Sequence, residues 1–146
     1  MLKVKFKKMM ANVKLPIKGS SHAACYDVFA HSITFDLNGN AVIGLGFKTE
    51  IPVGYKGVIV PRSGITKTRW VMNNNMGVID SDYRGEWMMK IKPMDGLHIS
   101  EAALPFGVGD RCAQIYFEKV LDVEFEEVEE LGTTDRNEGG FGSTGA

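Results

Sequence analysis

Hydrophobic and polar residues alternate along much of the chain, in short runs bounded by glycine, proline or asparagine. The pattern is clearest where Trp87, Met89 and Ile91 fall on one face of a strand and Lys90 and Lys92 on the other. Alternation with a period of two predicts a half-buried strand. Similar patterns, or runs of β-branched residues, predict further strands at 3–6, 24–30, 41–43, 57–60, 111–118 and 123–128.

Turn signals and a single helical segment complete the predicted order of elements. The Asn-Gly-Asn sequence at 38–40 lies between apolar runs and predicts a hairpin turn. A short helix is expected near 65–70, with Ser63 as its N-cap. Many short strands with one short helix predict an all-β fold, a jelly-roll-like barrel or sandwich. We expect residues 1–131 to form this core and residues 132–146 a flexible arm.

Composition narrows the class of protein. The chain has 146 residues, 44% hydrophobic and 24% charged, which suits one globular domain and excludes wholesale disorder. Its 17 basic and 18 acidic residues lack the basic excess of most nucleic-acid-binding proteins. No apolar run is long enough to span a bilayer, and the N-terminus lacks the apolar core of a secretory signal. We therefore expect a cytoplasmic or nuclear protein with no membrane partner.

Cysteine and histidine are sparse. Cys25 and Cys112 are expected to be reduced thiols, although two cysteines can also pair. The three histidines show no metal-ligand spacing, so a zinc site held by the protein is not expected.

Charge is distributed unevenly between the two ends of the chain. Residues 1–20 carry six lysines and no acids, whereas residues 118–130 carry seven acids and one lysine. One interpretation is two separate solvated faces. The other is that the two segments meet, within one chain or across a subunit interface.

Four short segments carry candidate chemistry, and each also has a purely structural interpretation. Arg62-Ser63-Gly64 follows a predicted strand and could bind an anion or form an ordinary turn. Within the segment 77–86, the five residues 80–84 place two carboxylates, a tyrosine and an arginine in one turn, where an aspartate could activate water. Asp27 lies in an apolar strand and should have a partner, because a buried acid without one is costly. Gln114 could donate to a phosphate or base, or simply point outward.

The glycine-rich C-terminal tail also has two interpretations. Residues 132–146 include five glycines and too few apolar side chains to order themselves. The sequence GGFGSTG nevertheless offers backbone N–H groups, two hydroxyls and one aromatic ring, Phe141. It is either an inert tail or an arm that binds phosphate and stacks on a flat ligand.

In this order and spacing, the segments resemble the five motifs of the homotrimeric dUTP pyrophosphatases (dUTPases), from residue 24 to residue 145. GVIDSDYRGE and GGFGSTG are the most specific of these motifs. The resemblance implies a trimeric jelly roll that hydrolyses dUTP to dUMP and pyrophosphate with Mg²⁺. Such an enzyme limits uracil in DNA and supplies the precursor of dTMP.

The resemblance also implies roles for individual residues. Asp80 would activate the attacking water, and Tyr83 would pack under the deoxyribose and exclude a 2′-hydroxyl. Asn74 would read uracil together with backbone groups of Val78 and Ile79. The remaining substrate contacts implied are a backbone contact at Met88, phosphate contacts from Arg62, Ser63, Gly64 and Gln114, and arm contacts from Arg136, Phe141, Gly142, Ser143 and Thr144. Asp27 would lie near the metal or support the site, while Mg²⁺ is held mainly by phosphates and water.

Some positions depart from the family pattern, and rival interpretations remain. Cys25 and Asn137 replace frequent glycines, and the stretch from 61 to 80 is one residue shorter than in many bacterial members. A dCTP deaminase of the same superfamily would need an acid–base group, for which Glu86 is the nearby candidate. The chain is also compatible with a regulatory protein that binds another protein and with a structural jelly roll.

Overall fold

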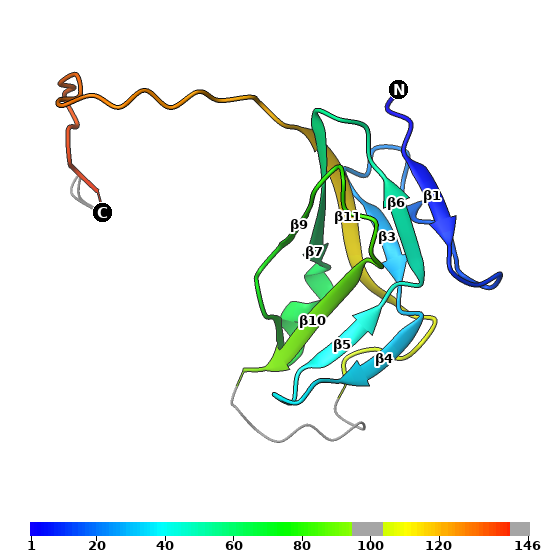
Figure 1. The fold of residues 1–146 in the computed structure, drawn as a ribbon. Helices are drawn as coiled ribbons and strands as arrows, with labels where there is room; N and C mark the ends of the chain where they lie inside the picture. The colour runs from blue at the N-terminus through cyan, green and yellow to red at the C-terminus, as the bar shows by residue number, and fades with distance from the viewer. Residues whose placement is uncertain (95–103, 141–146) are drawn as a thin grey trace.

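The computed structural model describes residues 1–94 and 104–140, in which eleven short strands and one 3₁₀ helix form an almost entirely β fold (Figure 1). The strands are β1 Lys5–Lys8, β2 Ile17–Lys18, β3 Tyr26–Phe29, β4 Ser32–Phe35, β5 Ala41–Gly44, β6 Phe47–Glu50, β7 Tyr55–Pro61, β8 Trp70–Met72, β9 Gly77–Ile79, β10 Met88–Pro93 and β11 Arg111–Lys119. The 3₁₀ helix, η1, spans Ser63–Lys67.

All strand pairs are antiparallel and belong to three sheets. The larger sheets have the strand orders β4-β5-β10-β8 and β2-β3-β11-β7-β9, and β1 pairs with β6 in a small third sheet. One hydrophobic cluster joins them, with Met89 and Ile91 from β10 packing in the same core as Ile59 from β7 and Ile115 from β11. The architecture confirms the predicted all-β fold, which resembles a jelly roll.

Trp87 lies at the centre of this core. Its ring packs 5.7 Å from that of Phe47 and 6.2 Å from that of Phe117, measured between centroids. Its indole N–H donates to the hydroxyl of Thr49 at 3.0 Å, which satisfies the buried polar atom. A Cβ at Gly57 would overlap the indole ring, so the strand β7 can pass this close only with glycine.

Several local predictions are confirmed. Trp87, Met89 and Ile91 are fully buried, whereas Lys90 is exposed, as the alternation requires. The Asn-Gly-Asn segment forms the turn between β4 and β5, with Gly39 in the left-handed region at φ 75°. Cys25 and Cys112 are free thiols.

Other predictions are wrong in detail. The predicted helix at 65–70 is the shorter 3₁₀ helix η1, because the chain enters β8 at Trp70. Ser63 is its first residue and not its cap; Arg62 occupies that position and makes no side-chain capping bond. Residues 123–128 form no strand, and residues 120–140 run away from the body beyond β11 (Figure 1). No helix among the described residues is long and apolar enough to cross a membrane.

Candidate active site

The turn at residues 80–84, which contains Asp80 and Asp82 and is called the carboxylate turn below, follows the edge strand β9. Strand β9 pairs with β7, and Asp80 is the first residue after it. The Tyr83 N–H donates to the Asp80 carbonyl at 3.2 Å, and an Arg84 guanidinium N–H donates to the Ser81 carbonyl at 2.7 Å. These bonds close the turn and leave the Asp80 side chain exposed. Within a single chain, this carboxylate is therefore open to solvent.

Tyr83 is fixed beside the same turn. Its hydroxyl donates to the Glu86 carbonyl at 3.1 Å, and its ring lies over Gly85, where a Cβ would collide with it. Because 40% of the residue remains exposed, its ring offers a rigid surface to a flat or apolar ligand. Glycine at 85 is thus required for the position of this ring.

Glu86 has a structural contact. Its carboxylate accepts the Gly46 backbone N–H at 2.7 Å and lies where a Cβ on Gly44 would project. The side chain is therefore packed against the β5–β6 connection. A carboxylate that accepts a backbone hydrogen bond in this way is poorly placed to act as a free acid or base.

The loop at 73–76 joins β8 of one large sheet to β9 of the other. Asn75 adopts a left-handed conformation at φ 57°, and its N–H donates to the Met72 carbonyl. The Asn73 side chain donates to Asn40, so it is committed to the neighbouring turn. The amide nitrogen of Asn74 lies instead beside Gly77, 3.8 Å from the point that a Cβ on that glycine would occupy. The Asn74 side chain therefore lies beside Gly77, at the start of β9.

The other predicted base-pocket residues lie on β9 and β10. Val78 is exposed, whereas Ile79 is half-buried against the core. Met88 begins β10 and has an exposed side chain. Their backbone groups flank the Asp80 turn from both sides in sequence.

The predicted phosphate-binding residues lie where β7 passes into η1. Asp27 on β3 is only 8% exposed and is held by two guanidinium groups. One of its oxygens accepts from Arg62 Nε at 3.0 Å and the other from Arg111 Nη1 at 3.2 Å. This confirms that the buried acid has a partner and shows that both of its oxygens are occupied. Ser63 and Gly64 are exposed beside Arg62.

Gln114 belongs to the same end of the sheet. It lies opposite Asp27 on β3 and opposite Val60 on β7, so the three side chains share one face. Nearby, a pocket of about 140 Å³ is lined by Arg62, Gly64, Ile65, Thr68, Pro105, Phe106, Arg111 and Cys112. Burial raises the pKa of the Cys112 thiol to about 12, so this sulfur stays protonated and is no nucleophile.

Within one chain, the carboxylate turn and the phosphate-binding loop at Arg62, Ser63 and Gly64 lie apart. Strand β9 ends with Ile79 opposite Gly57, whereas Arg62 follows the other end of β7. The five-residue separation along extended strand from Gly57 to Arg62 corresponds to about 17 Å. The carboxylate turn and the phosphate-binding loop therefore lie at opposite ends of β7.

The predicted arm residues are also apart from both groups. Arg136 lies within residues 120–140, and its Nε donates to the Gly139 carbonyl at 2.7 Å. Phe141, Gly142, Ser143 and Thr144 lie outside the described residues.

Sequence reasoning missed three residues that organise these groups. Arg111 shares Asp27 with Arg62, and Asn40 and Asn73 bond to each other beside the loop at 73–76. Arg111 lies in the same short segment as Gln114, which was a usable signal. Nothing in the sequence indicated the Asn40–Asn73 contact, because the residues are 33 positions apart.

Comparison with known proteins identifies the family. A model of the dUTPase family matches residues 11–145. The deoxyuridine 5′-triphosphate nucleotidohydrolase of Yarrowia lipolytica is 39% identical over 147 residues, covering 99% of this chain and 88% of that protein. The corresponding protein of Syntrophotalea carbinolica is 37% identical, covering 97% of this chain and 96% of its own.

A solved structure agrees with these relatives. The dUTPase of Staphylococcus bacteriophage 80alpha, determined with dUPNHPP, superposes with a TM-score of 0.81 at 27% identity and covers 99% of both chains. The fold and the sequence relatives thus agree, and the chain belongs to the dUTPase family.

Proposed function

We propose that this protein hydrolyses dUTP to dUMP and pyrophosphate. The observation that carries the proposal is the turn after β9, where an exposed carboxylate, Asp80, lies three residues from a fixed aromatic ring, Tyr83. This combination suits a nucleotide whose sugar packs on the ring while a water is activated beside its phosphates. The family relationship supports the same substrate.

In the proposed reaction, Asp80 accepts a proton from a water molecule as the water oxygen bonds to phosphorus. The bond between the α- and β-phosphates breaks, and pyrophosphate leaves with the bridging oxygen. Most of the acceleration comes from positioning and charge neutralisation, as in other phosphoryl transfers. Arg62 and Gln114 contribute contacts to the phosphates, and Arg136 contributes from the arm.

Sugar and base selection follow from the chemistry of Tyr83 and Asn74. A 2′-hydroxyl pressed against the Tyr83 ring would lose its hydrogen bonds to water, so ribonucleotides are disfavoured. The Asn74 amide carries both a donor and an acceptor and can pair with a uracil carbonyl and its N3–H. Backbone groups of Val78, Ile79 and Met88 complete the pocket.

The separation of the two groups along β7 supports a shared site. The separation of about 17 Å along β7 favours an arrangement in which Arg62, Ser63 and Gly64 act on a neighbour's substrate. We propose a homotrimer on this basis and from the family relationship. Residues 132–146 then act as the arm that closes a site, with Phe141 stacking on uracil and Gly142, Ser143 and Thr144 contacting phosphate.

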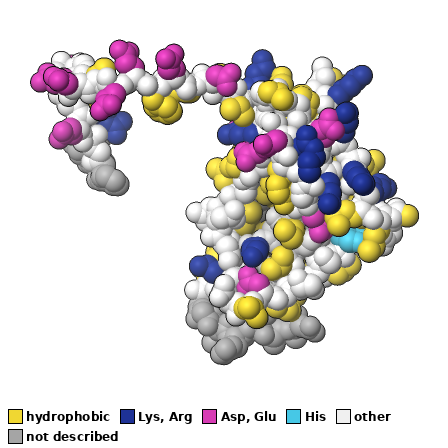
Figure 2. All heavy atoms as spheres, in the orientation of Figure 1, with side chains coloured by type: hydrophobic (Ala, Val, Ile, Leu, Met, Phe, Trp, Pro, Cys, Tyr) yellow, Lys and Arg dark blue, Asp and Glu magenta, His cyan; other side chains and the backbone are white. Residues whose placement is uncertain are grey.

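Charge on the surface supports contact between subunits. Lys and Arg side chains gather over β1 and β6, whereas Asp and Glu line the segment that leaves the body (Figure 2). In that segment Leu121, Val123 and Phe125 are exposed apolar residues that alternate with acids. An apolar, acidic extended segment needs a partner to bury its side chains, and the lysines of β1 on another subunit are complementary to it.

Mg²⁺ fits this site as an ion carried by the substrate. No group of three His, Cys, Asp or Glu side chains within residues 1–94 and 104–140 could hold a metal, and both oxygens of Asp27 are taken by arginines. Mg²⁺ commonly binds through substrate phosphates and keeps several waters. Once bound, the ion would neutralise phosphate charge, and Asp27 would act by positioning Arg62.

A deaminase activity is disfavoured by the position of Glu86. Its carboxylate accepts a backbone N–H from Gly46 and is packed beside Gly44. A deaminase would need this group free near C4 of cytosine. We therefore favour phosphate chemistry at Asp80.

The test is Mg²⁺-dependent pyrophosphate release from dUTP, with UTP, dTTP and dCTP measured in parallel. We expect release from dUTP alone. Ammonia release from dCTP would favour the deaminase instead. No turnover of any nucleotide would overturn the proposal and favour a regulatory binding protein, which a pull-down with and without dUTP would then detect.

A further inference from the structure

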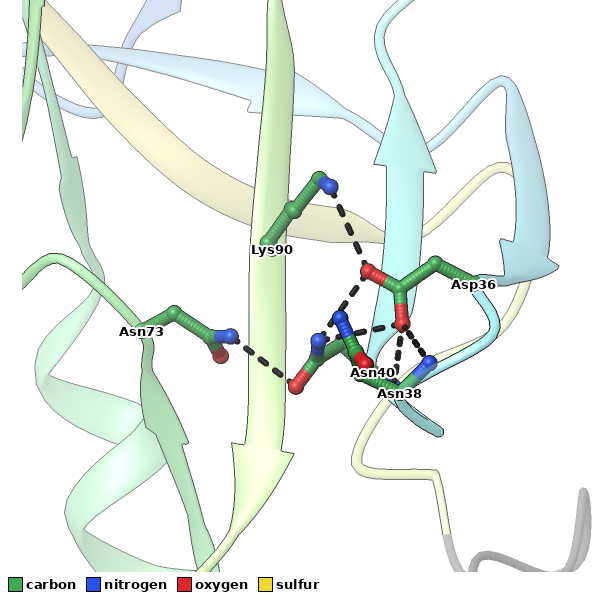
Figure 3. A network of polar contacts seen from close by, with 5 residues as sticks. All are labelled: Asp36, Asn38, Asn40, Asn73 and Lys90. Carbon is green, nitrogen blue, oxygen red and sulfur yellow. Dashed lines mark hydrogen bonds and ion pairs between the residues drawn. The ribbon is translucent and has the colours of Figure 1, made fainter.

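A polar network on the outer face of the four-stranded sheet connects the turn between β4 and β5 to the loop at 73–76 (Figure 3). Asn40 donates from Nδ2 to both carboxylate oxygens of Asp36, each at 3.0 Å. Asn73 donates from its own Nδ2 to Asn40 Oδ1 at 2.9 Å. Asn40 thus uses both ends of its amide, one toward the turn and one toward the loop.

The turn itself is held by several hydrogen bonds to Asp36. One Asp36 oxygen also accepts the backbone N–H groups of Asn38 and Asn40, each at 3.0 Å, and the other accepts from Lys90 Nζ at 3.3 Å. These bonds lower the pKa of Asp36 to about 2, with the Asn40 side chain as the largest cause. The carboxylate is therefore ionised throughout the physiological pH range and is a constant acceptor.

Asn73 is the first residue of the loop and is held at two points. Its backbone N–H donates to the Lys90 carbonyl at 3.0 Å, and its side chain is held by Asn40. Asn74 follows directly, and its amide nitrogen lies beside Gly77. The side-chain bond of Asn73 therefore restricts the backbone on which Asn74 is carried.

We propose that Asn40 is a positioning residue for substrate selection, which through Asn73 holds the loop at 73–76 in the conformation that presents Asn74 to the base. The inference rests on the proposed function, because it assumes that Asn74 contacts uracil. It adds a residue outside the five motifs, on the turn between β4 and β5. Asn40 raises the fraction of molecules in which the loop at 73–76 has its binding conformation. It does not change the rate of the chemical step.

The test uses dUMP binding by calorimetry, which probes the base and sugar pocket without a triphosphate or metal, alongside kcat and KM for dUTP. A net hydrogen bond of ordinary strength corresponds to about a three- to tenfold effect. We expect Asn40→Ala and Asn73→Ala each to weaken dUMP binding by about that factor and to raise KM similarly, with kcat nearly unchanged. The double variant should be no weaker than either single one, because both remove the same bond.

Two further variants separate positioning from general damage to the sheet. Lys90→Met removes the exposed ion pair with Asp36 but keeps the Asn40–Asn73 bond, so dUMP affinity should be unchanged. The swap Asp36→Asn with Asn40→Asp keeps an amide–carboxylate pair and an acceptor for Asn73. It should restore most of the affinity that Asn40→Ala loses.

The outcomes distinguish this inference from the proposed function. If the wild type neither binds dUMP nor hydrolyses dUTP, both fail together. If the wild type binds and the Asn40→Ala and Asn73→Ala variants bind equally well, the positioning role alone is overturned, even if their melting temperatures fall. A loss confined to kcat would overturn it too, since Asn40 would then act on the chemical step.

Discussion

Replacing the buried carboxylate of Asp27 by an amide should weaken both the fold and the binding of phosphate. In Asp27→Asn the shape is kept, but the charge is lost and an N–H group faces a guanidinium N–H. Hydrogen bonds to charged groups contribute about 1.5–3 kcal/mol each. Breaking a fully buried ion pair costs more, about 3–5 kcal/mol.

The solvent exposure of the two arginines that contact Asp27 sets the size of the expected loss of stability. The side chains of Arg62 and Arg111 are 33% and 49% exposed, so water can solvate both once the carboxylate is gone. We therefore expect a loss of about 2 kcal/mol, between one lost charged hydrogen bond and a fully buried pair. For a chain of this size that corresponds to a fall in Tm of about 4–8 °C.

Activity should fall as well, because Arg62 loses the group that orients it. We expect kcat/KM for dUTP to drop about 10- to 100-fold. Stability is measured by thermal and urea denaturation at one fixed protomer concentration, since an oligomer's Tm depends on concentration. The matched control is Arg111→Met, which removes one charged hydrogen bond but keeps the 3.0 Å bond between Arg62 and Asp27, and should therefore leave kcat/KM close to the wild type.

Two results would refute this reasoning. A stability within about 0.5 kcal/mol of the wild type would show that the two ion pairs contribute little net energy. Full recovery of activity at high Mg²⁺ concentration would show that Asp27 acts through the metal and not through Arg62.

Four further predictions concern other parts of the molecule. Asp80→Ala should lower kcat by several orders of magnitude while circular dichroism and Tm stay close to the wild type. Truncation after Thr134 should leave a folded oligomer by light scattering with severely impaired dUTP turnover. Gly57→Ala should cost about 2 kcal/mol in urea denaturation, because its new methyl overlaps the Trp87 ring. The pKa of Asp36 is lowered to about 2, so its stabilising contribution is present above about pH 4 and is lost as the pH falls toward 2; the stability difference between wild type and Asp36→Asn should shrink over that interval.

Each of these has an outcome that contradicts it. An active Asp80→Ala variant would remove the proposed base, and full activity of the truncated chain would remove the arm. Gly19→Ala, where a Cβ meets open space, is the control for Gly57→Ala, and equal losses in both would show that the indole contact is unimportant. A pH-independent difference for Asp36→Asn would show that its charge does not contribute.

Local patterns predicted the parts of the fold whose cause is local. Alternation from 87 to 92 indicated β10 because side chains in a strand point alternately to opposite faces. The glycine in the 38–40 turn indicated the β4–β5 hairpin because Gly39 adopts a positive φ. Residues 123–126 show the same alternation, yet 123–128 form no strand, because a strand needs a second strand to satisfy its backbone hydrogen bonds.

In the candidate site, too, some features follow from the sequence and others only from the tertiary structure. The sequence by itself determined which residue types stand together in each motif, and it indicated that Asp27 needs a partner. Only the tertiary structure decided that the partners are Arg62 and Arg111, that Glu86 is taken by Gly46, and that Asn40 holds Asn73. These contacts join strands far apart in sequence, and their register is set by packing of the whole core. The same register separates the carboxylate turn from the phosphate-binding loop by the length of β7, which no local pattern encodes.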